Sequence, residues 1–279
     1  MRVPAHGSQG LPPRMSHRLG RRIAFAGFCL GVALLVPNLV GLVTPGQRYD
    51  TTPGEAPPAE VADLRSVEDV ALRARASGVS GAREQAHVVQ KLISARFAPC
   101  ASRYTWGEDW IARALGLVWP DWDGHTPPAL LRWSDCALCS QVADTYALVL
   151  AELGIPARVV SMPGHVVNEV EWDGAWHVVD PHFGYFPDDD GLSDSADDLA
   201  RRPDILRARY EPLLPERAVA ATLEAYAAFG AGEGRRGQPG RTASPRLLVM
   251  HQITAWLRWV IPLALIGGGR VCGRRRAPA

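Results

Sequence analysis

The sequence lacks a surplus of charge of either sign and has few cysteines for its length. It contains 30 lysines and arginines against 29 aspartates and glutamates in 279 residues, which gives a formal net charge of +1. Such a balance, without a long basic stripe, argues against a dedicated nucleic-acid-binding protein. Five cysteines do not make a small domain held together by disulfides. The apolar fraction of 47% and the charged fraction of 21% are typical of globular proteins and exclude a wholly disordered chain.

An apolar run near the N-terminus is long enough to cross a membrane. Residues 23–43 contain no charged side chain, and roughly 20 apolar residues in a helix span the hydrocarbon core. Four arginines lie between positions 14 and 22, so the positive-inside rule predicts that residues 1–22 are cytoplasmic and that the chain continues on the other side. A cleaved signal peptide is the alternative, but residues 42–44 lack the small residues of a cleavage site.

A second apolar run, residues 247–269, lies near the C-terminus. It contains His251 and Arg258, and Trp256 and Trp259 flank the arginine as interfacial aromatic residues do. Further arginines at positions 270 and 274–276 predict a cytoplasmic tail over residues 270–279. The run is therefore predicted to be a second membrane span, with an interfacial amphipathic helix as the alternative. Both termini would be cytoplasmic and the central domain extracytoplasmic.

The part between the two apolar runs is predicted to form one domain. Residues 44–62 are rich in proline and residues 231–246 are rich in glycine and arginine, so both are predicted to be linkers around a domain at 63–230. Helical patterning covers residues 66–76, 81–97 and 104–117, and residues 119–128 are expected to form a loop.

A buried helix with a cysteine in its first turn is predicted from residue 139. Apolar residues recur at helical spacing from Cys139 to Leu153, and Gly154 and Pro156 stop the helix. Ser134 or Asp135 is expected to cap its start.

A β-hairpin is predicted next. Asp173 and Gly174 separate two alternating apolar runs, which is a strong signal for a two-residue turn. In the register set by that turn, His165 and Asp180 are diagonal neighbours on one sheet face, about 7–8 Å apart at the backbone. The sequence therefore predicts a His–Asp pair, which a slip of one residue would destroy.

A thiol near a helix N-terminus together with a His–Asp pair are the parts of a nucleophilic triad. Cys139 is the predicted nucleophile, His165 the general base and acid, and Asp180 the carboxylate that orients the histidine. The predicted reaction is acyl transfer from an amide or ester through a thioester. The indole N–H of Trp133 is one candidate oxyanion donor, although a place in the core suits this residue equally well.

Several segments in this region resemble the core of the transglutaminase-like superfamily. The matching segments, within residues 131–186, are 139–143, 153–158, 164–165, 176 and 179–181. The resemblance implies an α+β fold with a papain-like core, in which a cysteine-bearing helix packs on an antiparallel sheet that carries the histidine and the aspartate. It also implies the same three catalytic residues, Cys139, His165 and Asp180. No cofactor or metal is expected.

The sequence thus predicts a membrane-anchored cysteine enzyme, a peptidase or amidase (a hydrolase) or a transamidating acyltransferase, acting on a peptide, a protein or another amide-containing substrate of the cell envelope. One alternative is a catalytically silent binding module of the same fold. A second is a thiol–disulfide protein that uses Cys136 and Cys139. A disulfide from Cys136 to Cys100 or to Cys139 remains open, as does a zinc site built on Cys136 and Cys139 with His165 or His182.

Overall fold

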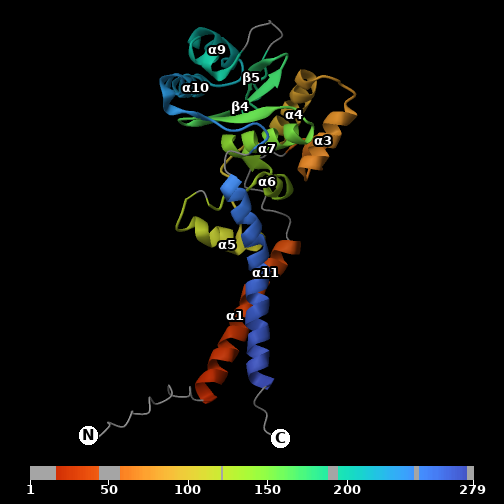
Figure 1. The fold of residues 1–279 in the computed structure, drawn as a ribbon, viewed down its shortest axis with the longest axis vertical. Helices are drawn as coiled ribbons and strands as arrows, with labels where there is room; N and C mark the ends of the chain where they lie inside the picture. The colour runs from red at the N-terminus through yellow and green to blue at the C-terminus, as the bar shows by residue number, and fades with distance from the viewer. Residues whose placement is uncertain (1–16, 44–56, 121, 188–193, 242–244, 275–279) are drawn as a thin grey trace, which may run out of the picture.

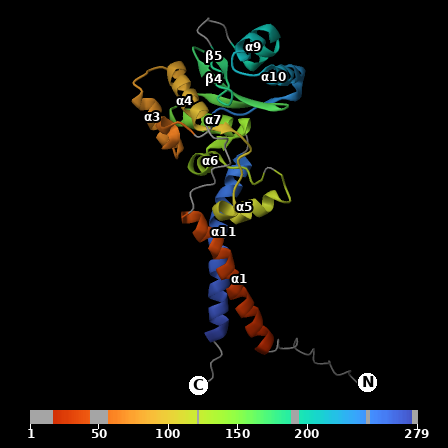
Figure 2. The same ribbon diagram turned by 180° about the vertical axis from the view of Figure 1, so that it is seen from behind.

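Two long helices form a stalk that carries the other described helices and strands at one end (Figure 1). The computed structural model describes residues 17–43, 57–120, 122–187, 194–241 and 245–274. Helices α1 (His17–Val43) and α11 (Pro245–Arg274) pack against each other along the stalk, as the reverse view also shows (Figure 2). Both contain a segment long and apolar enough to cross a membrane, at Leu19–Val43 and Pro245–Gly268.

The upper ends of the stalk helices are fastened to the domain by close contacts. Asn38 donates its side-chain N–H to the Arg258 carbonyl at 2.7 Å, which joins α1 to α11. Gly41 of α1 packs so closely on Gly107 that a Cβ at position 41 would clash with the Gly107 backbone. Gly107 belongs to α5 (Trp106–Gly116), which lies beside the top of the stalk in both views (Figures 1 and 2). The last turn of α1 and the first turns of α11 therefore belong to the domain.

The centre of the domain is an antiparallel sheet of four strands in the order β5-β4-β3-β6. The strands are β3 (Ala157–Met162), β4 (His165–Trp172), β5 (Ala175–Val179) and β6 (Arg235–Arg236). Trp172 pairs with Ala175 and Asn168 with Val179, so the predicted hairpin register is confirmed. Asp173 and Gly174 have φ values of 54° and 74°, as a type I′ turn requires.

Helices cover both faces of this sheet (Figure 1). On the stalk side lie α3 (Val67–Ala76), α4 (Ala82–Arg96) and α7 (Cys139–Glu152); on the other side lie α8 (Ala196–Ala200), α9 (Pro203–Tyr210) and α10 (Glu216–Ala228). In β4, Val170 packs in the cluster that contains α7, whereas Val167 packs in the cluster that contains α9 and α10. Because strand β4 is buried on both faces, the side chains at its ends are held in place by helices from either side.

The structure confirms most of the predicted helices. The patterned segments 66–76, 81–97 and 104–117 contain α3, α4 and α5, and the helix predicted from Cys139 is α7. Helix α7 ends before Gly154, which has a φ of 75°. The chain is therefore a mixed α+β protein with an antiparallel sheet, as predicted.

Three expectations about local structure were wrong. Helix α6 (Pro127–Trp133) begins inside the predicted loop, because a proline fits the first turn of a helix. Helix α2 (Ala59–Ala62) lies within the first predicted linker, and β6 and the end of the π-helical turn Phe229–Glu233 lie within the second. The N-cap of α7 is Leu138, whereas Ser134 and Asp135 are engaged elsewhere. Residues 44–56 of the first linker lie outside the described residues.

Candidate active site

Cys139 is the first residue of α7, and its sulfur carries no disulfide. The main-chain N–H groups of a first helical turn have no partner within the helix and form its positive end. Gln141 holds this turn in place: its Oε1 accepts from the Leu138 N–H at 3.0 Å, and its Nε2 donates to the carbonyls of Ser102 and His125 at 2.8 and 3.2 Å. The cysteine is half-buried, so a reactant from solvent can reach it.

His165 and Asp180 form the buried pair that the hairpin register predicts. His165 begins β4 and Asp180 directly follows β5, and the distance from Nε2 to Oδ2 is 2.7 Å. The histidine is 6% exposed and the aspartate is fully buried. Because Nε2 faces Asp180, Nδ1 is the nitrogen left for another partner, and the neighbouring Cys139 helps to raise the pKa of this imidazole.

The charges of this group favour a protonated histidine. Burial by itself lowers the pKa of His165, but the Asp180 carboxylate and the neighbouring Cys139 outweigh it and raise that pKa to about 10. For Asp180, complete burial by itself raises the pKa. The His165 imidazolium and the Phe183 backbone N–H outweigh burial and hold this pKa below its usual value. At neutral pH the pair is therefore an imidazolium with a carboxylate.

Asp180 accepts three further hydrogen bonds that the sequence analysis did not predict. Its Oδ1 accepts from the backbone N–H groups of His182 and Phe183, each at 3.1 Å. Its Oδ2 accepts from the Tyr210 hydroxyl at 3.1 Å, and the Phe183 ring stacks on His165 with centroids 4.8 Å apart. An aspartate before Pro181 is a recognised turn former, so the two backbone contacts had a signal in the sequence. Tyr210 had none, because it lies on a separate helix 30 residues away.

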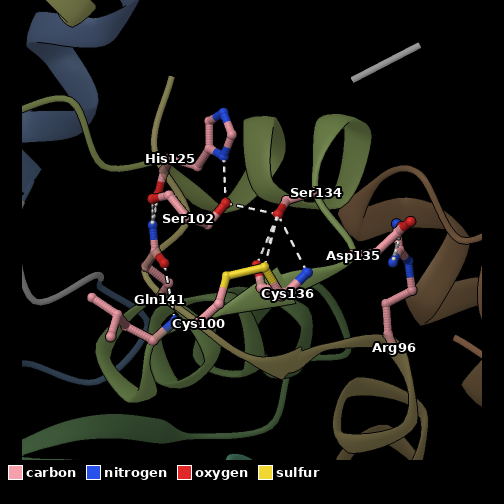
Figure 3. The surroundings of a disulfide bond; sticks show 9 residues. Arg96, Cys100, Ser102, His125, Ser134, Asp135, Cys136 and Gln141 are labelled. Atoms are coloured by element: carbon pink, nitrogen blue, oxygen red, sulfur yellow. Dashed lines mark hydrogen bonds and ion pairs between the residues drawn. A yellow bond between two sulfur atoms is a disulfide. The ribbon is translucent and has the colours of Figure 1, made fainter. Parts of the chain in front are cut away.

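The segment before Cys139 is held by a disulfide between Cys100 and Cys136, with 5.4 Å between their Cα atoms (Figure 3). This bond joins the parallel strands β1 (Ala98–Pro99) and β2 (Cys136–Ala137). Of the two disulfides left open by the sequence, the structure contains the one that leaves Cys139 free. With Cys136 in that bond, its sulfur is available neither as the partner of Cys139 in a dithiol couple nor as a zinc ligand.

Polar contacts reinforce the same segment (Figure 3). Ser102 donates to the Ser134 hydroxyl at 2.7 Å, and that hydroxyl donates to the Cys136 carbonyl at 2.8 Å. Asp135 forms an ion pair at 2.7 Å with Arg96, whose side chain is fully buried. The start of α7 is therefore fixed by covalent, ionic and hydrogen-bonding contacts together.

Trp133, the candidate oxyanion donor, lies between α6 and the stalk helices. It ends α6 and lines a cavity that also involves Asn38 of α1 and Trp259 of α11, and the Arg132 guanidinium lies 4.7 Å from its ring centre. Cys139 is not among the described residues that line this cavity. The position of Trp133 favours a structural role near the stalk over that of an oxyanion donor.

A different cavity, of about 260 Å³, lies beside the start of α7. Leu138, Ser140 and Gln141 line it on either side of Cys139, and Leu247 and Leu248 line it from the first turn of α11. None of Cys139, His165 and Asp180 is among the described residues that line it.

Together these contacts define a cysteine at a helix N-terminus beside a buried His–Asp pair on a neighbouring sheet. The sequence matches no protein-family model, and no curated protein matches it at a significant level. A solved structure described as "Crystal structure of a TGase" is similar over 49% of this chain, with 21% identity and a TM-score of 0.30. The present chain spans 35% of the length of that protein.

Proposed function

We propose that this chain is a membrane-anchored cysteine enzyme with a transglutaminase-like, papain-like core, which acts on amide bonds through a thioester. The observation that supports this most directly is the Cys139–His165–Asp180 arrangement. An imidazolium beside a thiol at a helix N-terminus is how cysteine enzymes generate a nucleophilic thiolate. The buried, multiply hydrogen-bonded Asp180 keeps the imidazole in one orientation, as a triad requires.

The proposed reaction has two halves. In the first, the Cys139 sulfur attacks the amide carbonyl carbon, the C–N bond breaks, and His165 gives its proton to the departing amine. In the second, His165 takes a proton from water as the water oxygen attacks the thioester carbon, and the C–S bond breaks. This releases the acid and leaves the Cys139 thiolate beside the His165 imidazolium. An amine in place of water gives a new amide. The Cys139 backbone N–H, at the open end of α7, is the proposed donor to the developing oxyanion.

Peptidase or amidase activity is the form we favour. Hydrolysis needs only water as the second reactant, whereas transamidation needs a site that admits an amine and excludes water. The proposed substrate is a peptide, a protein or another amide-containing component of the cell envelope.

The membrane part of the proposal is supported by the exposure of the two stalk helices. Only 11% and 17% of the apolar windows in α1 and α11 are buried, so these helices are not the core of the domain. Large apolar side chains are also exposed on α5 and the loop after it, beside the stalk: Trp106, Leu117, Val118, Trp119 and Trp122. Tryptophans at this level suit the membrane–water interface.

We further propose that the domain is extracytoplasmic and that both termini are cytoplasmic. The arginines before the apolar part of α1 and after that of α11 support this orientation, and a disulfide suits an oxidising compartment. Fusing a fluorescent protein that matures only in the cytoplasm to the C-terminus tests it. Fluorescence is expected, and a dark but intact fusion would contradict the orientation.

The enzyme proposal is tested with the full chain in detergent, a glutamine-containing peptide and hydroxylamine, which converts a thioester into a hydroxamate. The wild type is expected to form the peptide hydroxamate, and Cys139→Ser is expected to form none. Cys29→Ser, which removes the free cysteine of α1, is the matched control and should behave as the wild type does.

Labelling by iodoacetamide at about pH 6.5, below the usual thiol pKa near 8.5, tests the Cys–His pair without a substrate. Cys139 is expected to react readily in the wild type and slowly in His165→Ala. Equal reaction rates in both proteins would favour the silent binding module.

A further inference from the structure

A second cavity lies where the stalk meets the domain, between α1, α5, α6 and α11. Its volume is about 580 Å³, within the range of small-molecule sites. Its lining includes Asn38 of α1, Trp133 of α6 and three residues of α11, His251, Arg258 and Trp259. It is distinct from the cavity beside the start of α7.

Buried polar atoms in this lining lack partners. His251 is 4% exposed, and neither ring nitrogen has a hydrogen-bond partner among the described residues; Asn38 is 1% exposed and its Oδ1 has none there either. The Tyr104 ring beside His251, with centroids 4.7 Å apart, offers packing rather than a hydrogen bond. Unsatisfied buried groups are costly, so an occupant with hydrogen-bond donors and acceptors would relieve an existing penalty here.

Three arginines line the same cavity: Arg65, Arg132 and Arg258. Within the described part of the chain, none of the three forms an ion pair with a carboxylate, and the buried Arg258 Nε has no hydrogen-bond partner. Their donors are therefore available to an anion.

Two carboxylates also line the cavity, but both are engaged in the protein. Glu108 accepts from the Thr105 N–H and contacts His125, each at 2.9 Å. Asp109 accepts from the Thr254 hydroxyl at 2.6 Å and caps the N–H groups of Ile111 and Ala112. With three arginines against two occupied carboxylates, the lining carries an excess of positive charge and of free donors.

We propose that this cavity binds the phosphate-bearing head group of an anionic membrane lipid. The arginines would hold the phosphate, and His251 and Asn38 would bond to head-group hydroxyls. Two apolar neighbours from the stalk, Leu42 and Ala255, line the cavity toward the apolar surface of α1 and α11, where acyl chains would lie. Trp133 and Trp259 are the aromatic residues that occur at this depth in membranes. This chemistry favours a lipid over a free phosphate ion, which would use neither the indoles nor the apolar side.

The lipid site rests on the proposed membrane insertion of α1 and α11 and does not depend on the chemistry of Cys139. It is tested by thermal unfolding of the delipidated full chain in a nonionic detergent, with added dioleoylphosphatidylglycerol, dioleoylphosphatidylcholine or inorganic phosphate. Phosphatidylglycerol is expected to raise the Tm saturably and the other two are not. Stabilisation by mass action gives the apparent affinity.

Arg132→Gln combined with Arg258→Gln is expected to weaken the apparent affinity for phosphatidylglycerol by roughly fivefold for each arginine removed. Arg201→Gln combined with Arg217→Gln removes two exposed arginines that do not line the cavity, which makes the same charge change and should have no effect. Where the double variant does not fold, Arg65→Gln takes its place, since its side chain is exposed.

Three results would overturn the proposal. Phosphatidylcholine could stabilise the protein as much as phosphatidylglycerol does, inorganic phosphate alone could reproduce the effect, or the arginine variants could bind as the wild type does. Cys139→Ser should keep the full response to phosphatidylglycerol, so a failure of the enzyme proposal is distinguishable from a failure of the lipid site.

Discussion

Tyr210 donates its hydroxyl hydrogen to Oδ2 of Asp180, the same oxygen that contacts Nε2 of His165. A helix on the outer face of the sheet thus reaches the carboxylate that orients the histidine. Two backbone N–H groups donate to the other oxygen, Oδ1, so both oxygens of the Asp180 carboxylate are hydrogen-bonded. Such a fully satisfied buried network restricts the imidazole to one position.

Tyr210→Phe should therefore destabilise the protein. A lost hydrogen bond to a buried charged group lowers the free energy of unfolding by about 1.5–3 kcal/mol. Denaturant unfolding in detergent measures it. Tyr146→Phe is the matched control, because that hydroxyl donates to the neutral Ala86 carbonyl at 3.0 Å and its loss should cost about 1 kcal/mol. Equal losses in the two variants would contradict a special role for Tyr210.

The stabilising effect of His165 should depend on pH. Its pKa is raised from 6.5 to about 10, so the folded protein binds this proton more tightly than the unfolded chain does. The contribution of His165 to the free energy of unfolding is complete below pH 6.5 and is lost as the pH rises to about 10. The difference in unfolding free energy between wild type and His165→Gln should therefore shrink across this window, by at most about 1.4 kcal/mol per pH unit. In Asp180→Asn the pKa of His165 should be less raised, so its contribution to the free energy of unfolding should be lost at a lower pH. A difference that stays constant between these pH values would refute the ion pair.

Removal of the Cys100–Cys136 disulfide should reduce the stability of the protein and leave the reactivity of the Cys139 thiol unchanged. The bond closes a loop of 36 residues, and its loss in the double variant Cys100→Ser, Cys136→Ser is expected to cost about 2–4 kcal/mol. Thermal unfolding measures the loss, and peptide mass spectrometry measures iodoacetamide labelling of Cys139. If labelling of Cys139 required Cys136, the result would support the thiol–disulfide interpretation.

Arg96→Met should be strongly destabilising. The buried guanidinium pairs with Asp135 and also donates to the carbonyls of Leu64 and Leu131, each at 3.3 Å. Its removal breaks the ion pair with Asp135 and takes the donor from two carbonyls, at an expected cost of about 3–5 kcal/mol in unfolding free energy. Arg201→Met, which breaks an exposed ion pair with Asp198, is the control and should leave the unfolding midpoint nearly unchanged.

The sequence by itself determined the features that depend on local periodicity. The Asp173–Gly174 turn sets the hairpin register, and the two-residue period of a strand then places His165 and Asp180 on one face. Helix α7 ends where glycine adopts a positive φ, and the two long helices follow from the length of their apolar runs.

Only the tertiary structure decided which distant segments meet. Nothing in local pattern joins Cys136 to Cys100 rather than to Cys139, brings Tyr210 to Asp180, or places Trp133 beside the stalk. The same holds for β6, two residues of an expected linker that add an edge strand to the sheet. These contacts depend on how helices and strands pack in three dimensions, where sequence separation carries no information about distance.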